Sequence, residues 1–210
     1  MAVMDKNLPT KYIALTFDDG PSSLTPDILD VLESNGVRGT FFLIGQNIND
    51  DTKAIIRRQI SMGCEICNHS LTHSHMSTLS KDEIVSEINT TSQKIFDVTG
   101  EYPRFFRPPF IDVNDLMYES IDLPFICGID SVDWDSEVSC EERISNVLSQ
   151  VKDGAIVLMH DFVENHDTVK ALPIIIEKLK DEGYNFVTLS ELFALKGVNP
   201  NQPKTIWSFV

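Results

Sequence analysis

Two adjacent carboxylates, Asp18 and Asp19, follow a short apolar run at residues 12–17 and precede Gly20-Pro21. Adjacent carboxylates at the end of a strand can share a hydrolytic reaction, because one can bind a metal ion while the other removes a proton from water. The same Asp-Asp-Gly-Pro sequence also suits an ordinary surface turn. Residues elsewhere in the chain are needed to distinguish a reactive site from a turn.

A pair of histidines, His69 and His73, lies four positions apart. On a helical turn this spacing makes the two side chains neighbours, about 5–6 Å apart at Cβ. Two histidines and one carboxylate form the usual three-ligand zinc site with an open position for water, and Asp19 or Asp18 could supply the carboxylate. His75 is expected to turn away from this pair toward the surface.

Two further groups could assist such a site. His160 follows the apolar run at residues 155–159 and could act as a general acid if a carboxylate holds its ring, although a buried core histidine would give the same pattern. Arg107 precedes Pro108-Pro109, so its guanidinium could orient a carboxylate such as Asp18 or form an ordinary structural ion pair. Trp134 and Leu158 would suit an apolar wall beside a small group such as a methyl, or simply the core.

These residues depend on strand ends for their positions. Seven β-rich runs alternate with helical periodicity, which predicts an α/β fold with parallel strands. Seven units in about 190 residues favour a distorted or incomplete (β/α) barrel over a full one, and a doubly wound open sheet is the alternative. Five of the seven strand ends carry charged or imidazole groups, which predicts one pocket at the carboxyl edge. The runs are 12–17, 39–44, 64–68, 104–107, 124–128, 154–159 and 185–188.

Composition narrows the classes of function. The 210 residues are 42% apolar, enough for one domain over residues 1–198, followed by a loosely ordered tail at 199–210. A net charge of −15 without a basic cluster argues against a nucleic-acid partner. No apolar run approaches a membrane span, and residues 1–11 lack the apolar stretch of a signal peptide. His166 is expected to be solvated, and four cysteines are expected to be small buried residues rather than a zinc site: Cys64, Cys67, Cys127 and Cys140.

Five short motifs, in order over roughly residues 12–195, resemble those of the polysaccharide deacetylase family with the NodB homology domain, carbohydrate esterase family 4. They are Thr16-Phe-Asp-Asp-Gly-Pro21, His69-Ser-Leu-Thr-His73, Arg107-Pro-Pro-Phe110, Asp130-Ser-Val-Asp-Trp134 and Leu158-Met-His160. The resemblance implies a distorted (β/α) barrel and metal-dependent removal of acetyl groups from a carbohydrate.

The resemblance also implies a role for each matching residue. The implied ion is zinc, with cobalt or nickel as alternatives. The resemblance implies that Asp18 is the base, oriented by Arg107, and that Asp19, His69 and His73 bind the metal. It implies that His160 is the general acid, tuned by Asp133. The Phe110 amide would bind the oxyanion, and Leu158 would line the acetate pocket.

Two departures from the family pattern affect details. Many members continue the third motif with a glycine where this chain has Ile111, so we expect a different loop beside the sugar. The approach to His69 reads Gly63-Cys-Glu-Ile-Cys-Asn, which changes packing behind the metal but spares the ligands.

Three other segments, 52–58, 105–109 and 186–193, most resemble clostridial acetylxylan esterases of this family. We therefore expect O-deacetylation of acetylxylan, with N-deacetylation of N-acetylglucosamine polymers as the alternative. A small-molecule amidohydrolase or a non-catalytic sugar-binding member is a more distant alternative. We expect a monomer, secreted or at the cell surface, that is a module of a larger polysaccharide-degrading protein, with a cytoplasmic location as the alternative.

Overall fold

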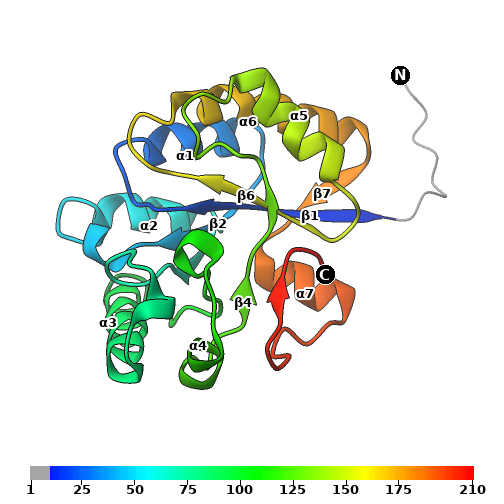
Figure 1. Ribbon diagram of the computed structural model, residues 1–210. Coiled ribbons are helices and arrows are strands. Elements are labelled where there is room, and N and C mark those ends of the chain that lie inside the picture. The colour runs from blue at the N-terminus through cyan, green and yellow to red at the C-terminus, as the bar shows by residue number, and fades with distance from the viewer. Residues whose placement is uncertain (1–9) are drawn as a thin grey trace.

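The computed structural model describes residues 10–210, and its elements alternate between strands and helices along most of the chain (Figure 1). The strands are β1 (Lys11–Asp18), β2 (Thr40–Leu43), β3 (Glu65–Asn68), β4 (Phe125–Ile126), β5 (Ile129–Asp130), β6 (Ala155–His160), β7 (Tyr184–Phe186) and β8 (Ile206–Trp207). The helices are α1 (Thr25–Ser34), α2 (Lys53–Ser61), α3 (Lys81–Thr99), α4 (Asp115–Ser120), α5 (Cys140–Gln150), α6 (His166–Asp181) and α7 (Leu189–Lys196).

The strands form a distorted, parallel barrel-like sheet. Strand β1 lies at its centre, between β6 on one side and β2 and β7 on the other, and the order continues from β2 to β3 and from β6 to β5. The ring closes through Phe106, whose backbone bridges Asn68 of β3 and Phe125 of β4. The predicted barrel is confirmed. The predicted strand at 104–107 is reduced to these single bridges, and the run at 124–128 is divided between β4 and β5.

Alternating side chains of β1 pack into two different cores. Ile13, Leu15 and Phe17 face a core shared with α1 and α6, whereas Ala14 faces the barrel interior, which α7 covers. Because strand residues alternate in direction, Thr16 and Asp18 lie on the same interior face as Ala14. Figure 1 shows α1, α5 and α6 on one side of the sheet and α7 on the other. Asp18, the first catalytic candidate, therefore lies at the carboxyl end of the barrel interior.

Local sequence signals mark the starts of two helices. Ser80 and Glu83 form a reciprocal capping box at the start of α3, and the proline after Thr25 occupies the first turn of α1. Exposed His166 begins α6, as expected for a solvated residue. The four cysteines form no disulfide; Cys64 and Cys67 are buried as predicted, whereas Cys127 and Cys140 are only half-buried. Within residues 10–210, no helix is both long and apolar enough to cross a lipid bilayer.

The segment at residues 199–210 differs from the loosely ordered tail that its prolines and polar residues suggested. Strand β8 pairs in parallel with β4, and the Val210 amide donates to the Gly154 carbonyl over 2.9 Å. Trp207 packs edge-on against Phe193 of α7 at 5.3 Å between ring centroids. The terminal segment is ordered because it covers the barrel interior together with α7, a contact that local composition does not reveal.

We predict that Trp207→Ala lowers the free energy of unfolding by about 2–3 kcal/mol, because it removes an aromatic contact from this half-buried surface. Urea denaturation followed by circular dichroism would measure the change. Trp134→Ala is the matched control, since the Trp134 side chain is 56% exposed and should cost less than about 1 kcal/mol. Equal losses in the two variants would contradict a structural role for the terminal segment.

Candidate active site

A pocket of about 500 Å³ opens at the carboxyl edge of the sheet. Eight of the ten residues predicted from the sequence line it, and the other two, Arg107 and Asp133, lie behind and contact Asp18 and His160. The lining residues are Asp18, Asp19, His69, His73, Pro108, Phe110, Ile111, Asp130, Trp134, Leu158 and His160. The strand-end argument therefore predicted the position of the pocket correctly.

The two adjacent aspartates reach the same pocket because the backbone turns between them. Asp18 is the last residue of β1 and is almost fully buried, facing the barrel interior. Neighbouring residues of a strand point to opposite faces, but Asp19 has a φ of 74°, in the left-handed region. This turn places an Asp19 oxygen 3.3 Å from His69 Nε2, while the nearest Asp18 oxygen is 3.7 Å from the same nitrogen.

The two histidines converge through an irregular loop, so the predicted helical turn at residues 69–73 is wrong. Ser70 and His73 both have left-handed backbones, with φ of 64° and 57°. The Nδ1 of His69 lies 2.7 Å from the Arg107 carbonyl, which can only accept, so Nδ1 carries the proton and Nε2 is free to bind a metal. His75 lies outside the cluster, with a side chain that is 60% exposed.

Asp19, His69 and His73 fit a divalent metal ion. One ligand atom from each lies within 4.8 Å of the others, and Asp19 Oδ1 is 3.3 Å from the Nε2 atom of both histidines. This buried oxygen has no hydrogen-bond partner, which a bound cation would supply. One carboxylate and two imidazoles are the ligand set of an open zinc site.

The pKa shifts of the same three groups are consistent with a site that binds a cation. Burial raises the pKa of Asp19, but the neighbouring His69 imidazole, 3.3 Å from Asp19 Oδ1, outweighs it together with the charges of His160 and His73, and the pKa is lowered to about 2. Burial also lowers the pKa of His69, but Asp18 and Asp19 outweigh it and raise the pKa, whereas burial and the neighbouring His69 lower the pKa of His73. The same two aspartates that raise the pKa of His69 would attract a metal ion to this cluster.

Arg107 is fully buried and holds Asp18. Its Nη1 donates to Asp18 Oδ1 over 2.7 Å and to the Thr16 hydroxyl over 2.8 Å. The guanidinium carbon also lies 4.3 Å from the centre of the Phe42 ring, inside the barrel. A buried guanidinium that donates to one carboxylate oxygen fixes the orientation of that carboxylate. The other Asp18 oxygen remains on the side of His69.

His160 faces the pocket from β6 while its other ring nitrogen is held from behind. The Nδ1 of His160 donates to Asp133 Oδ1 over 2.7 Å, which leaves Nε2 toward the pocket. Burial lowers the pKa of His160, but the hydrogen bond and charge of Asp133 outweigh it and raise the pKa to about 9. The imidazole is therefore protonated at neutral pH, as a general acid requires.

Apolar side chains form the walls of the pocket. Leu158 is buried in β6, whereas Phe110 and Trp134 are more than half exposed at the rim, where the Trp134 indole donates to Asp130 over 3.2 Å. Ile111 has a φ of 53°, although β-branched residues rarely adopt the left-handed region. A glycine at this position would adopt the conformation without strain, and nothing in the structure explains why this chain has isoleucine there.

Several residues around the site were given no role from the sequence. Thr16 accepts a hydrogen bond from Arg107, Asp130 accepts one from Trp134, and buried Asp161 accepts from Ser22 in the loop after β1 and from Thr25 at the start of α1. Asp130 and Asp161 lie at strand ends, so the sequence indicated that they are near the site. It did not indicate their hydrogen-bond partners. Two further residues, Asn165 and Thr168, contact Asp133 from the start of α6, and no sequence pattern indicated them.

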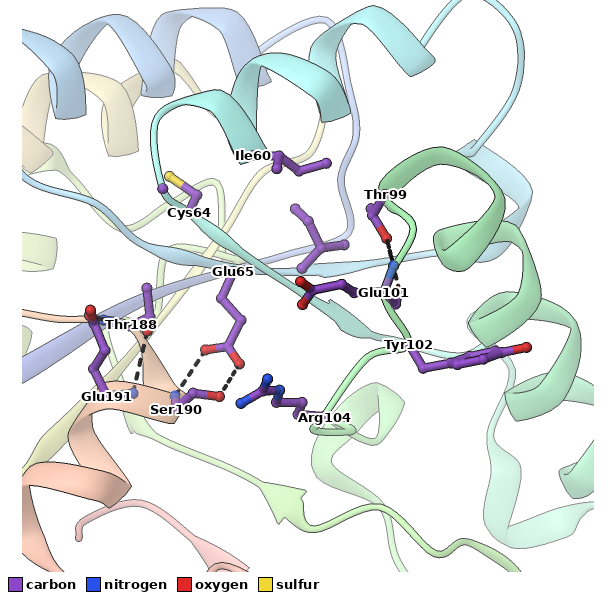
Figure 2. Close-up of a pocket in the computed structure, with 12 residues that line it drawn as sticks. Ile60, Cys64, Glu65, Thr99, Glu101, Tyr102, Arg104, Thr188, Ser190 and Glu191 are labelled. Carbon is purple, nitrogen blue, oxygen red and sulfur yellow. Dashed lines mark hydrogen bonds between the residues drawn. The ribbon is translucent and has the colours of Figure 1, made fainter.

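A second hollow of about 300 Å³ lies at the amino edge of the sheet (Figure 2). Glu65, the first residue of β3, accepts from the backbone and hydroxyl of Ser190 at the start of α7. Figure 2 shows its carboxylate turned toward that helix end, where negative charge is stabilised. This carboxylate is therefore part of the packing of α7.

We predict that His69→Ala lowers zinc affinity more than about 100-fold, beyond the 10- to 100-fold typical of a residue that only supports a ligand. Isothermal titration of the metal-free protein would measure the loss. His75→Ala is the control, because that imidazole lies outside the cluster and its removal should leave affinity unchanged. A comparable loss in both variants would mean that the ion does not bind at the predicted ligands.

We predict that Asp133→Asn lowers the pKa of His160 from about 9, because the hydrogen bond and charge of Asp133 are the largest effects that oppose burial and only the weaker charges of Asp18 and Asp19 remain. The raised pKa stabilises the folded state fully below about pH 6.5, the unfolded value, and this stabilisation is lost as pH rises through about 9. NMR titration of the imidazole in metal-free protein would measure the shift. An unchanged pKa would exclude Asp133 as its cause.

Comparisons with known proteins agree with this geometry. The profile of the family described as "Polysaccharide deacetylase" matches residues 5–123. The bifunctional xylanase/deacetylase of Pseudobutyrivibrio xylanivorans is 54% identical over 200 residues, covering 95% of this chain, which spans only a third of that relative.

Two solved structures match nearly the whole chain. The Xyl-CE4 domain of a multidomain xylanase from the hindgut metagenome of Trinervitermes trinervoides has a TM-score of 0.94 and 53% identity, with 96% of this chain and 98% of that chain covered. A family 4 acetyl xylan esterase from Clostridium thermocellum, in complex with a cobalt ion, has a TM-score of 0.92 and 44% identity, with 95% and 99% covered. The chain therefore belongs to the polysaccharide deacetylase family, carbohydrate esterase family 4.

Proposed function

We propose that this chain is a metal-dependent deacetylase that hydrolyses O-acetyl esters of acetylxylan, with zinc as its ion. The observation that carries the proposal is the meeting of a metal-ligand cluster, a buried carboxylate and a protonated imidazole around one pocket. The xylan substrate is supported by two of the most similar relatives, a xylanase/deacetylase and an acetyl xylan esterase.

The ion would be held by Asp19, His69 and His73, and when bound it supplies a Lewis acid that lowers the pKa of water and polarises a carbonyl. Asp18, fixed by Arg107, accepts the proton that water loses as its oxygen attacks the acetyl carbon.

The remaining residues act on the acetyl group and the departing sugar. The backbone amide of Phe110 donates to the oxygen that becomes negative during the attack. His160 then gives its Nε2 proton to the sugar oxygen as the carbon–oxygen bond breaks, because an alkoxide is a poor leaving group. Leu158 and Trp134 provide apolar surface for the acetyl methyl. The proton taken by Asp18 and the proton given by His160 balance, so the products are acetic acid and a free hydroxyl.

Amide cleavage is the second candidate, because the same base, acid and ion can act on the N-acetyl group of N-acetylglucosamine polymers. Such polymers would use the same walls, and the exposed side chains of Phe110 and Trp134 can each stack against a sugar ring. The choice between ester and amide therefore depends on the sugar rather than on the catalytic residues.

We also propose that the chain acts outside the cell as one module of a longer polysaccharide-degrading protein. Two observations support the role as a module: the chain spans a third of the xylanase/deacetylase, and the structural relative from the termite hindgut is a domain of a multidomain xylanase. The location outside the cell follows from the proposed substrate, because a polymer such as xylan is too large to enter a cell.

We predict metal-dependent acetate release from acetylxylan that exceeds release from N-acetylchitooligosaccharides. Acetate would be measured after chelation and after adding back Zn²⁺ or Co²⁺. Asp18→Asn should lower turnover at least about 100-fold and retain zinc, because it removes the base but no ligand. Asp97→Asn, an exposed carboxylate in α3, is the matched control and should keep full activity.

Release chiefly from the chitooligosaccharides would show that the enzyme acts on amino-sugar substrates and would overturn the xylan assignment. Release from neither polymer by the zinc-loaded protein would overturn the polysaccharide assignment for this chain. Near wild-type turnover in Asp18→Asn would exclude Asp18 as the base.

A further inference from the structure

A buried arginine lies behind the pair formed by Asp133 and His160. Arg143, in α5, is 4% exposed and makes no ion pair with any carboxylate in residues 10–210. Its Nη1 donates to Asn165 Oδ1 and, over 3.0 Å, to the Thr168 hydroxyl. Because an uncompensated buried cation is costly, this guanidinium needs a negative partner that it reaches through these two neutral side chains.

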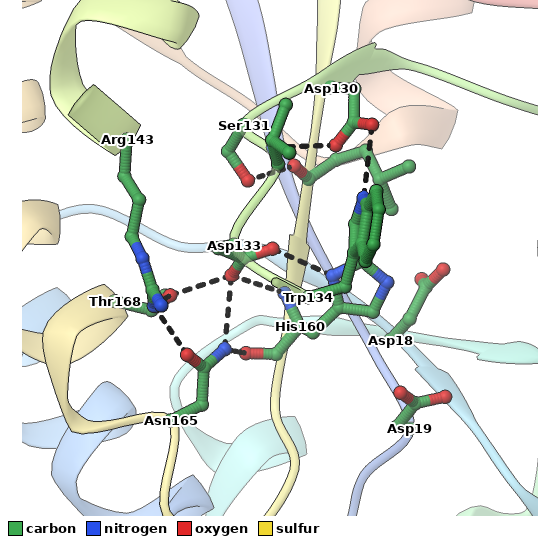
Figure 3. A network of polar contacts seen from close by, with 12 residues as sticks. Asp18, Asp19, Asp130, Ser131, Asp133, Trp134, Arg143, His160, Asn165 and Thr168 are labelled. Atoms are coloured by element: carbon green, nitrogen blue, oxygen red, sulfur yellow. Dashed lines mark hydrogen bonds and ion pairs between the residues drawn. The ribbon is translucent and has the colours of Figure 1, made fainter. Parts of the chain in front are cut away.

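That partner is Asp133, which is 1% exposed (Figure 3). Thr168 donates to Asp133 Oδ2 over 2.6 Å, and the Asn165 amide donates to the same oxygen over 3.2 Å. The backbone amide of His160 is a third donor, at 2.9 Å. Oδ2 is thus surrounded by donors, which leaves Oδ1 for the His160 ring.

The guanidinium decides which way both bridging groups point. Arg143 can only donate, so the Thr168 oxygen accepts from it and the single hydroxyl proton is directed to Asp133. For the same reason Asn165 presents its carbonyl to Arg143 and its NH₂ group to Asp133. If these orientations reversed, Asp133 would face an acceptor instead of a donor. Arg143 therefore fixes the orientation of two donors to Asp133, and through them it holds the carboxylate in one rotational position.

We propose that Arg143, acting through Asn165 and Thr168, is a positioning residue that aims His160 Nε2 at the leaving atom of the substrate. This inference rests on the proposed role of His160 as general acid. The three residues touch neither the pocket nor the substrate. They act only through Asp133, so their effect depends on how much the leaving group needs a proton.

Substrates with different leaving groups provide the test, because leaving groups differ in how much they need a proton to depart. The phenolate of 4-nitrophenyl acetate departs without protonation, whereas that of 4-methylphenyl acetate is about as basic as a tyrosine side chain, whose pKa is about 10. The alkoxide of a sugar ester is more basic still. A defect in aiming the proton should therefore grow along this series, whereas a general loss of structure should lower all three rates alike.

We expect Thr168→Val to lower kcat on acetylated xylooligosaccharides about tenfold and on 4-methylphenyl acetate severalfold. Both KM values and the rate on 4-nitrophenyl acetate should stay within about twofold. Thr168→Ser retains the hydroxyl and should restore the wild-type ratio of the three rates. Thr25→Val is the matched control: its hydroxyl also donates to a buried carboxylate over 2.6 Å, but that carboxylate is Asp161, so the ratio should not change.

Equal losses on all three substrates, an unchanged ratio, or a failure of Thr168→Ser to restore it would overturn the proposal. If Thr168→Val does not fold, Asn165→Ala removes another donor to Asp133 and should give the same selective loss. The aryl acetates report on His160 independently of sugar preference. A wild-type enzyme that cleaves them but no sugar ester would therefore contradict the proposed substrate without contradicting the role of Arg143.

Discussion

The parallel pairing of β1 with β6 is the constraint on which the site depends. Its register sets Asp18 directly beside His160 at the carboxyl ends of the two strands. Neighbouring strands lie about 4.8 Å apart, so the proposed base and acid reach the same pocket from a rigid backbone. The loops that supply the metal ligands need only complete an arrangement that the central strands have already fixed.

Two buried arginines organise the two halves of this chemistry in different ways. Arg107 contacts the carboxylate of Asp18 directly, whereas Arg143 reaches that of Asp133 through Asn165 and Thr168. The direct contact fixes the orientation of the carboxylate and uses one of its oxygens. The indirect one supplies two donors to a single oxygen, which leaves the other free to hold an imidazole. Each carboxylate thus keeps one oxygen for the chemistry that its arginine supports.

The metal ligands and the pocket wall depend on unusual backbone conformations. Asp19, Ser70, His73 and Ile111 all have positive φ, each at a point where a regular strand or helix would turn the side chain elsewhere. Such conformations cost of order 1–3 kcal/mol each and persist only where the surrounding structure enforces them. The stable barrel beneath these four residues provides that support.

The sequence by itself determined the fold class, the edge of the sheet where the pocket lies, and the identity of ten residues around it, because strand periodicity and five ordered motifs are local signals. It did not determine the loop of His69 and His73, predicted as a helical turn, or the terminal segment, predicted as loosely ordered. Those depend on left-handed residues and on pairing with a distant strand. Only the tertiary structure brought Arg143 and Thr168 behind Asp133, because their hydrogen bonds join segments 22–35 residues apart and leave no periodic trace in the chain.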